Sequence, residues 1–143
     1  MSRTLLYAAA ISASLIVAAA ASATSGQLVR TAQNAQLNTT VLIDRQGHTL
    51  YALSVERKGR FICTTKTCLS FWHPLVVAKG TKPTGQVALS TIKRPDGRIQ
   101  VTYNGWPLYH WIGDTTAGED TGEGITDSGG VWYAVDAAGQ PVR

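Results

Sequence analysis

The chain has 143 residues, of which 44% are hydrophobic and 15% are charged, and its formal net charge is +4. This length fits a single small domain, and so small a net charge argues against a nucleic-acid-binding protein. The charges are unevenly spread. Ten Lys and Arg residues lie between Arg45 and Arg98, whereas six acids and no base lie between Tyr109 and Asp136. Such a layout can orient partners, although the solvated faces of a β domain explain it as well.

Residues 1–23 have the three parts of a secretory signal peptide. Arg3 supplies the positive charge, an apolar stretch of 17 residues runs from Leu5 to Ala21, and Ala21-Ser22-Ala23 has the small residues that signal peptidase accepts. The alternative is an uncleaved anchor, but 17 mostly small residues are few for a hydrocarbon core of about 30 Å. We therefore expect an extracytoplasmic protein, periplasmic or secreted, that meets the membrane only transiently through this signal helix.

The rest of the chain is predicted to be all-β. Residues 24–38 have few bulky apolar side chains and are expected to be a flexible leader. From residue 39 to residue 143, turn signals recur about every ten residues, which is typical of short strands. Asn104-Gly105 between two strand-like runs predicts a hairpin with a type I′ turn. We expect one domain, a small antiparallel β sandwich or partly open barrel.

Two stretches of this domain, about 39–80 and 87–139, repeat one pattern. Each contains Gly-x-x-Leu-Tyr, followed two residues after the Tyr by a bulky apolar residue and three further on by an acid. The three positions are Tyr51, Leu53 and Glu56 in the first copy, and Tyr109, Trp111 and Asp114 in the second. Alternation along a strand puts the Tyr and the apolar residue of each copy on the same face. We expect the two copies to pack together around these side chains.

The second copy resembles a known family. Tyr109-His110-Trp111-Ile112-Gly113-Asp114 fits the pattern Tyr-x-aromatic-x-x-Asp, and Arg94-Pro95-Asp96-Gly97 before it fits as well. From about Val29 to Gly139, the chain is similar to the bacterial secreted-repeat family of predicted lipoproteins with the Tyr-x-(Phe/Trp/Tyr)-x-x-Asp motif. The first copy departs from the motif at Leu53 and Glu56, and the lipobox is absent. The resemblance implies no catalytic residue, cofactor or substrate.

Cys63 and Cys68 are the only cysteines of the chain. In a protein that leaves the reducing cytoplasm, such a pair is most simply a structural disulfide. A catalytic dithiol usually has two intervening residues and a helix N-terminus beside it. Here the cysteines have four residues between them and no helix signal. We predict a disulfide, with active redox chemistry as the alternative.

The remaining titratable residues offer weaker candidates. The three histidines, His48, His73 and His110, can form a metal site only if the fold brings them together, and we predict neither a metal nor a cofactor. The acidic loop 113–130 does not follow the order of ligands in an EF-hand Ca²⁺ site. Asp114 is instead expected to fix its turn by accepting hydrogen bonds from the backbone N–H groups of residues 115–118.

Trp106 is the first candidate for a ligand contact. It directly follows the Asn104-Gly105 turn, where a side chain is expected to be exposed. The other aromatic residues are expected in the core.

No catalytic constellation is visible in the sequence, and the Gly-x-Ser-x-Gly elbow of serine hydrolases is absent. We therefore expect a non-catalytic binding or structural module of the cell envelope. Its partner would be an envelope protein, a cell-wall component or a small ligand. The alternative is an accessory to extracytoplasmic redox or metal handling, through the cysteine pair or the histidines.

Overall fold

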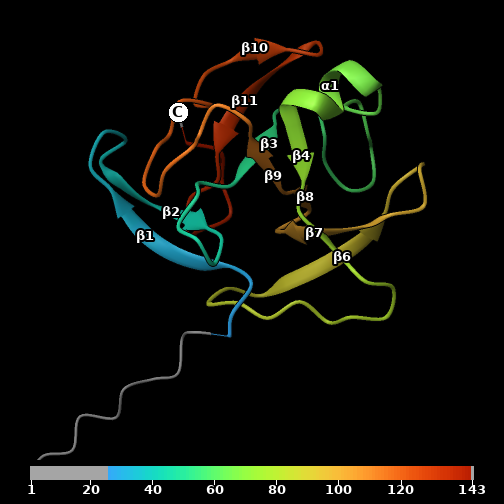
Figure 1. Cartoon of the computed structure of the whole chain (residues 1–143), viewed down its shortest axis with the longest axis horizontal. Helices are drawn as coiled ribbons and strands as arrows, with labels where there is room; N and C mark the ends of the chain where they lie inside the picture. The colour runs from blue at the N-terminus through green and yellow to red at the C-terminus, as the bar shows by residue number, and fades with distance from the viewer. Residues whose placement is uncertain (1–25, 143) are drawn as a thin grey trace, which may run out of the picture.

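The computed structural model describes residues 26–142, which form short antiparallel strands and one six-residue helix (Figure 1). The expected all-β, antiparallel architecture is confirmed for these residues. The expected signal peptide, residues 1–23, lies outside them. No helix in this part of the chain is long and apolar enough to cross a membrane.

The strands form three sheets. The first contains β1 (Arg30–Asn34) and β2 (Thr39–Ile43). The central sheet, in the order β10-β11-β3-β9-β4, contains β3 (Tyr51–Leu53), β4 (Trp72–Pro74), β9 (Tyr109–Trp111), β10 (Thr126–Asp127) and β11 (Gly130–Ala134). In the third, β7 (Ile99–Tyr103) pairs with β5 (Val76–Val77), β6 (Leu89–Lys93) and β8 (Trp106–Pro107). The helix α1 (Lys66–Phe71) directly precedes β4.

The two copies of the sequence pattern exchange strands in the central sheet. β3 of the first copy and β9 of the second are neighbours, and Tyr51 lies directly opposite Tyr109. β4 follows β3 in the chain but pairs with β9, whereas β11 follows β9 and pairs with β3. Each copy therefore completes the sheet of the other.

The core of the molecule lies on both faces of this central sheet. Tyr51 and Leu53 of β3 enter one hydrophobic cluster, and Ala52 between them enters the other. Tyr109 joins the first cluster and Trp111 packs against it, so the prediction that each Tyr shares a face with the apolar residue after it is confirmed. In both copies, strand alternation directs the motif side chains to the same cluster.

Two stacked tryptophans join the copies at the centre of the first cluster. The ring centroids of Trp72 and Trp132 are 3.9 Å apart, and the ring planes differ by 8°. Tyr51 meets Trp72 edge-on, and Tyr109 meets Trp132 in the same way. Edge-to-face aromatic contacts add to the stabilisation that burial alone gives. The expectation that the copies pack around their aromatic rings is correct.

The expectation of a flexible leader over residues 24–38 is wrong for residues 28–38, and residues 24 and 25 lie outside the described part of the chain. Val29 is fully buried, and β1 pairs with β2 along its whole length. The backbone N–H of Leu28 also donates to the carbonyl of Thr84, so this segment is held by residues far along the chain. The polar composition of the segment predicts flexibility, but the segment is stabilised by strand pairing more than by apolar side chains.

The helix α1 begins between the two cysteines and contains Cys68, where the sequence indicated no helix. Thr65 is its N-cap, and the Thr65 hydroxyl accepts a hydrogen bond from the backbone N–H of Cys68 at 3.1 Å. Such a cap satisfies one of the free N–H groups in the first turn of a helix. Six residues are too few to display a helical period in the sequence.

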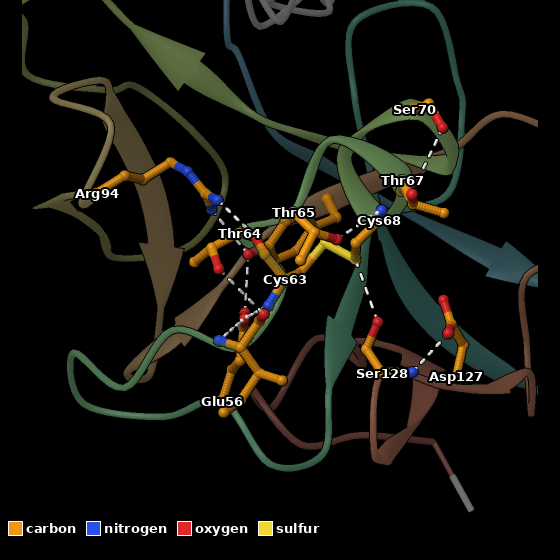
Figure 2. Close-up of a disulfide and its surroundings, with 12 residues drawn as sticks. Glu56, Cys63, Thr64, Thr65, Thr67, Cys68, Ser70, Arg94, Asp127 and Ser128 are labelled. Atoms are coloured by element: carbon orange, nitrogen blue, oxygen red, sulfur yellow. Dashed lines mark hydrogen bonds between the residues drawn. A yellow bond between two sulfur atoms is a disulfide. The ribbon is translucent and has the colours of Figure 1, made fainter.

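The predicted disulfide between Cys63 and Cys68 closes the loop between them (Figure 2). The Cα atoms of the two cysteines are 5.5 Å apart, and both residues are buried. The Ser128 hydroxyl contacts the Cys68 sulfur at 3.4 Å, which attaches the loop to the β10–β11 turn. The disulfide therefore fixes α1 against the central sheet.

Replacing both cysteines by Ala tests the stabilisation by this disulfide. The double variant is expected to fold but to lose about 2 kcal/mol of unfolding free energy, the loop-closure term for a ring this small. Urea denaturation followed by tryptophan fluorescence measures the loss. An unchanged midpoint, or titration of free thiols in the native wild-type protein, would contradict the assignment.

Candidate functional site

The motif residues of the two copies form reciprocal hydrogen bonds. The Tyr51 hydroxyl donates to Oδ2 of Asp114 at 2.6 Å. The Tyr109 hydroxyl donates to Oε2 of Glu56 at 2.8 Å. Each tyrosine thus binds the acid of the other copy, and all four residues are buried.

The second oxygen of each acid organises the loop that follows it. Oε1 of Glu56 accepts the backbone N–H groups of Ile62 and Cys63, both at 2.6 Å. Oδ1 of Asp114 accepts the backbone N–H of Thr121 at 3.0 Å and its hydroxyl at 2.6 Å. Both carboxylates therefore join a tyrosine of one copy to a loop of the other.

The expected role of Asp114 in capping residues 115–118 is wrong. Glu119 accepts the backbone N–H groups of Thr115 and Thr116 instead. The Asp114 side chain turns toward the core, where it meets the Tyr51 hydroxyl. The sequence could not reveal this partner, because Tyr51 lies 63 residues earlier in the chain.

Arg94 adds a buried positive charge to one half of this network. Its guanidinium donates to the Tyr109 hydroxyl at 2.8 Å, to Oε1 of Gln100 at 2.6 Å and to the Cys63 carbonyl at 2.6 Å. The backbone of Cys63 is thus held by Glu56 at its N–H and by Arg94 at its carbonyl (Figure 2). In the sequence, Arg94 is notable only as part of the segment Arg94-Pro95-Asp96-Gly97 that resembles the family. Nothing local in the sequence indicates its burial.

These groups are suited to holding the fold together. Burial raises the pKa of both Tyr51 and Tyr109 above the ordinary value for tyrosine, and the neighbouring carboxylates Asp114 and Glu56 raise it further. Both phenols therefore keep their protons at neutral pH. Because Glu56 and Arg94 are almost inaccessible to solvent, their half of the network offers no surface to a ligand.

All three histidines converge on one open pocket of about 320 Å³. His48 comes from the turn before β3, His73 from β4 and His110 from β9. His73 and His110 are directly opposite each other on paired strands. The pocket is lined by Asp44, His48, His73, His110, Trp111, Ile112 and Asp114. The pairing of β4 with β9 brings the last two histidines together, and it joins segments too far apart to be inferred from spacing.

Asp44 orients two of these rings. Its Oδ1 accepts the backbone N–H groups of Gln46 and His48 at 2.8 and 2.9 Å. Its Oδ2 lies 3.3 Å from Nδ1 of His48 and 3.0 Å from Nε2 of His110. Burial alone would raise the pKa of Asp44, but the hydrogen bonds from His110 and His48 outweigh it and hold that pKa well below its usual range. The carboxylate is therefore charged, and the two ring nitrogens that face it are assigned as N–H donors.

Exposed apolar side chains lie beside the histidines. Ile112 is 51% exposed and Phe71 is 45% exposed, and the Ile112 N–H donates to the Phe71 carbonyl at 3.0 Å. The Phe71 ring lies against that of Trp111, with 6.2 Å between centroids. We call the pocket residues together with Phe71 the histidine face. Within residues 26–142, no group of three or more His, Cys, Asp or Glu side chains is arranged to hold a metal ion.

The expected exposure of Trp106 is wrong, since its side chain is only 6% exposed. Asn104 and Gly105 both have positive φ, as the predicted turn requires, and this turn pairs Tyr103 with Trp106. The ring folds back into the second hydrophobic cluster, and the guanidinium of Arg57 covers it at 4.9 Å from the ring centroid. Trp106 still lines a pocket, away from the histidine face.

Removing single hydroxyl groups tests the reciprocal bonds. Tyr109→Phe is expected to lower the free energy of unfolding by about 2 kcal/mol, because it takes one hydrogen bond from each of two buried charges. Tyr51→Phe is expected to act in the same direction. In the control, Tyr103→Phe, the lost acceptor is the neutral carbonyl of Ala137, and the expected loss is about 1 kcal/mol. Equal losses in Tyr109→Phe and Tyr103→Phe, measured by urea denaturation, would argue against a special role for the buried charges.

Stability should also fall in alkali. Tyrosines of the unfolded chain ionise near pH 10, whereas Tyr51 and Tyr109 of the folded protein have a raised pKa and stay protonated. Unfolding therefore releases protons above about pH 10, so the free energy of unfolding is retained below that pH and decreases as the pH rises further. Denaturation series from about pH 8 to about pH 11 measure this slope. The double variant Tyr51→Phe/Tyr109→Phe should give a flatter one, and an identical slope would refute the assignment.

Comparison with known proteins gives one match. Residues 90–136 match a family described as a secreted repeat of unknown function. The matched segment contains Tyr109, Trp111 and Asp114, and it is shorter than the stretch from Val29 to Gly139 over which the sequence resembles the family. No curated protein and no solved structure matches the chain. Residues 90–136 are therefore similar to a repeat of this secreted family, as the resemblance predicted.

Proposed function

We propose that this protein is a non-catalytic binding module of the cell envelope and that its histidine face binds an envelope protein. The observation that carries the proposal is the convergence of His48, His73 and His110 on one open pocket beside the exposed side chains of Ile112 and Phe71. The signal-peptide pattern and the match to a secreted family support a site of action in the periplasm or the medium.

The chemistry of the histidine face supports a protein partner. Large apolar side chains in water favour burial, by about 25 cal/mol for each Å² of apolar area. Aromatic residues are enriched in the cores of protein interfaces, and charged residues are depleted there. Outside the reciprocal network, Asp44 is the acid that lines the pocket, and its carboxylate already has the His48 and His110 rings as hydrogen-bond partners. A partner with apolar side chains and hydrogen-bonding groups would therefore fit this face.

A non-catalytic role agrees with the burial and the mutual hydrogen bonding of the side chains that could otherwise take part in catalysis. Tyr51, Tyr109, Glu56 and Asp114 are buried and bound to one another. The alternative role in redox or metal handling has less support. Both sulfurs of the disulfide are buried, whereas a redox-active pair must meet the sulfur of its partner.

Site-specific photocrosslinking in native cells tests this proposal. A photoreactive phenylalanine analogue is placed at Ile112, on the histidine face, or at Val76, which is 41% exposed and does not line the histidine pocket. We expect a discrete crosslinked envelope protein from position 112 and none from position 76. His73→Ala should reduce the yield of that adduct at least about fivefold, the effect of about 1 kcal/mol at an interface.

The comparison of the two positions makes the result interpretable. Equal adducts from both positions would indicate random encounters, and no adduct from position 112 would contradict the proposed face. The His73→Ala protein must retain the urea midpoint of the wild type, so that a lower yield reports binding and not unfolding. His73 is exposed and its side chain contributes to neither core cluster, which makes this outcome expected.

A further inference from the structure

We propose a second binding site, in the pocket beside Trp106, for a carboxylate-bearing sugar of the cell wall. This pocket has a volume of about 660 Å³, within the range of known small-molecule sites. It shares no lining residue with the histidine face. The inference therefore goes beyond the proposed protein-binding role and can fail or succeed separately.

The indole N–H of Trp106 is the first observation. Its Nε1 is buried and has no hydrogen-bond partner within residues 26–142. A buried donor without a partner costs free energy, which an acceptor bound at the pocket would recover. Trp72 and Trp132 also have unpartnered N–H groups, but both rings are fully buried and line none of the pockets described. Among these tryptophans, Trp106 is the one whose ring lines a pocket.

Arg57 supplies a positive charge beside this indole. Its guanidinium lies 4.9 Å from the centroid of the Trp106 ring. Its hydrogen bond to the carbonyl of Asn104 is long, at 3.4 Å, and no carboxylate within residues 26–142 forms an ion pair with it. Guanidinium groups bind carboxylates through two parallel N–H donors. Arg57 and Trp106 together therefore favour an acceptor with negative charge.

The rest of the lining favours a sugar with a single negative charge. Asp136 uses one carboxylate oxygen to accept the backbone N–H of Gln140 at 2.8 Å, and its other oxygen has no hydrogen bond within the described residues. This oxygen, the Gln140 amide and the Thr39 hydroxyl can bond to neighbouring hydroxyl groups. Because the Asp136 carboxylate in the same lining would repel a second negative charge, a doubly charged phosphate would be a poorer ligand. A hydroxyl-rich ring with one carboxylate fits both sets of groups.

The test is an NMR titration of the ¹⁵N-labelled exported protein with three probes. N-acetylmuramic acid has both the sugar ring and the carboxylate, N-acetylglucosamine lacks the lactyl carboxylate, and lactate lacks the sugar. The observed signal is the indole N–H of Trp106, assigned with a Trp106→Phe variant. We expect N-acetylmuramic acid to shift this signal with saturation, and the other two probes to shift it much less.

Charge variants complete the test. Arg57→Gln is expected to weaken the binding of N-acetylmuramic acid about tenfold, the effect of losing one charged hydrogen bond. Arg60→Gln is the matched control, because Arg60 is an exposed base in the same loop that lines none of the pockets described. This control should bind like the wild type.

Several outcomes would overturn the proposal. An equal response to N-acetylglucosamine would show that the site does not recognise the carboxylate. An equal response to lactate would show that it does not recognise the sugar ring. No saturable shift with any probe would refute the site itself. None of these results bears on crosslinking from Ile112, so failure here is distinguishable from failure of the proposed protein-binding face.

Discussion

The fold depends on two buried hydrogen bonds that each join a tyrosine of one copy to an acid of the other. A buried carboxylate is tolerated only when hydrogen bonds replace its lost hydration. Glu56 and Asp114 obtain these bonds from a tyrosine hydroxyl of the other copy and from the loop that follows them in their own copy. One copy alone would leave its tyrosine hydroxyl without a carboxylate acceptor and its acid without the tyrosine donor, which gives a physical reason for the pattern to occur twice in one chain. The backbone of each copy also depends on the other copy, because β4 of the first pairs with β9 of the second and β11 of the second pairs with β3 of the first.

The two copies differ at positions that do not take part in the reciprocal tyrosine–acid hydrogen bonds. Beside Tyr109, Arg94 bridges to the disulfide loop, whereas beside Tyr51 only the backbone N–H of Gly122 approaches the hydroxyl, at 3.3 Å. At the apolar motif position, Leu53 is fully buried, but its counterpart Trp111 extends to the surface and lines the histidine pocket. The duplicated scaffold is therefore symmetric in its reciprocal tyrosine–acid bonds, whereas the residues around these bonds differ in the core, at Arg94, and at the surface, at Trp111.

The sequence predicts what short-range patterns determine. Alternation placed Tyr51 and Leu53 on one face correctly, and Asn104-Gly105 predicted a turn whose two residues both have positive φ. Apart from the short helix α1, the errors concern long-range contacts. Residues 29–34 become a strand because β2 and the segment near Thr84 accept them, and Arg94 is buried because Cys63 and Tyr109 supply its acceptors. Trp106 is buried because its turn returns the ring to a core that also receives Val29 and Val135.

The geometry also explains why resemblance to the family predicts the fold of this chain but does not identify its ligand. In Tyr-x-aromatic-x-x-Asp, the specified tyrosine and acid, Tyr109 and Asp114, are bound by the core and by the other copy. The unspecified positions next to the aromatic residue are His110 and Ile112, and strand alternation directs them away from the side that Tyr109 faces. Both of them line the histidine pocket. In this chain, the tyrosine and the acid of the motif therefore hold the scaffold together, whereas His110 and Ile112, which the motif leaves open, line the pocket together with Trp111 and Asp114.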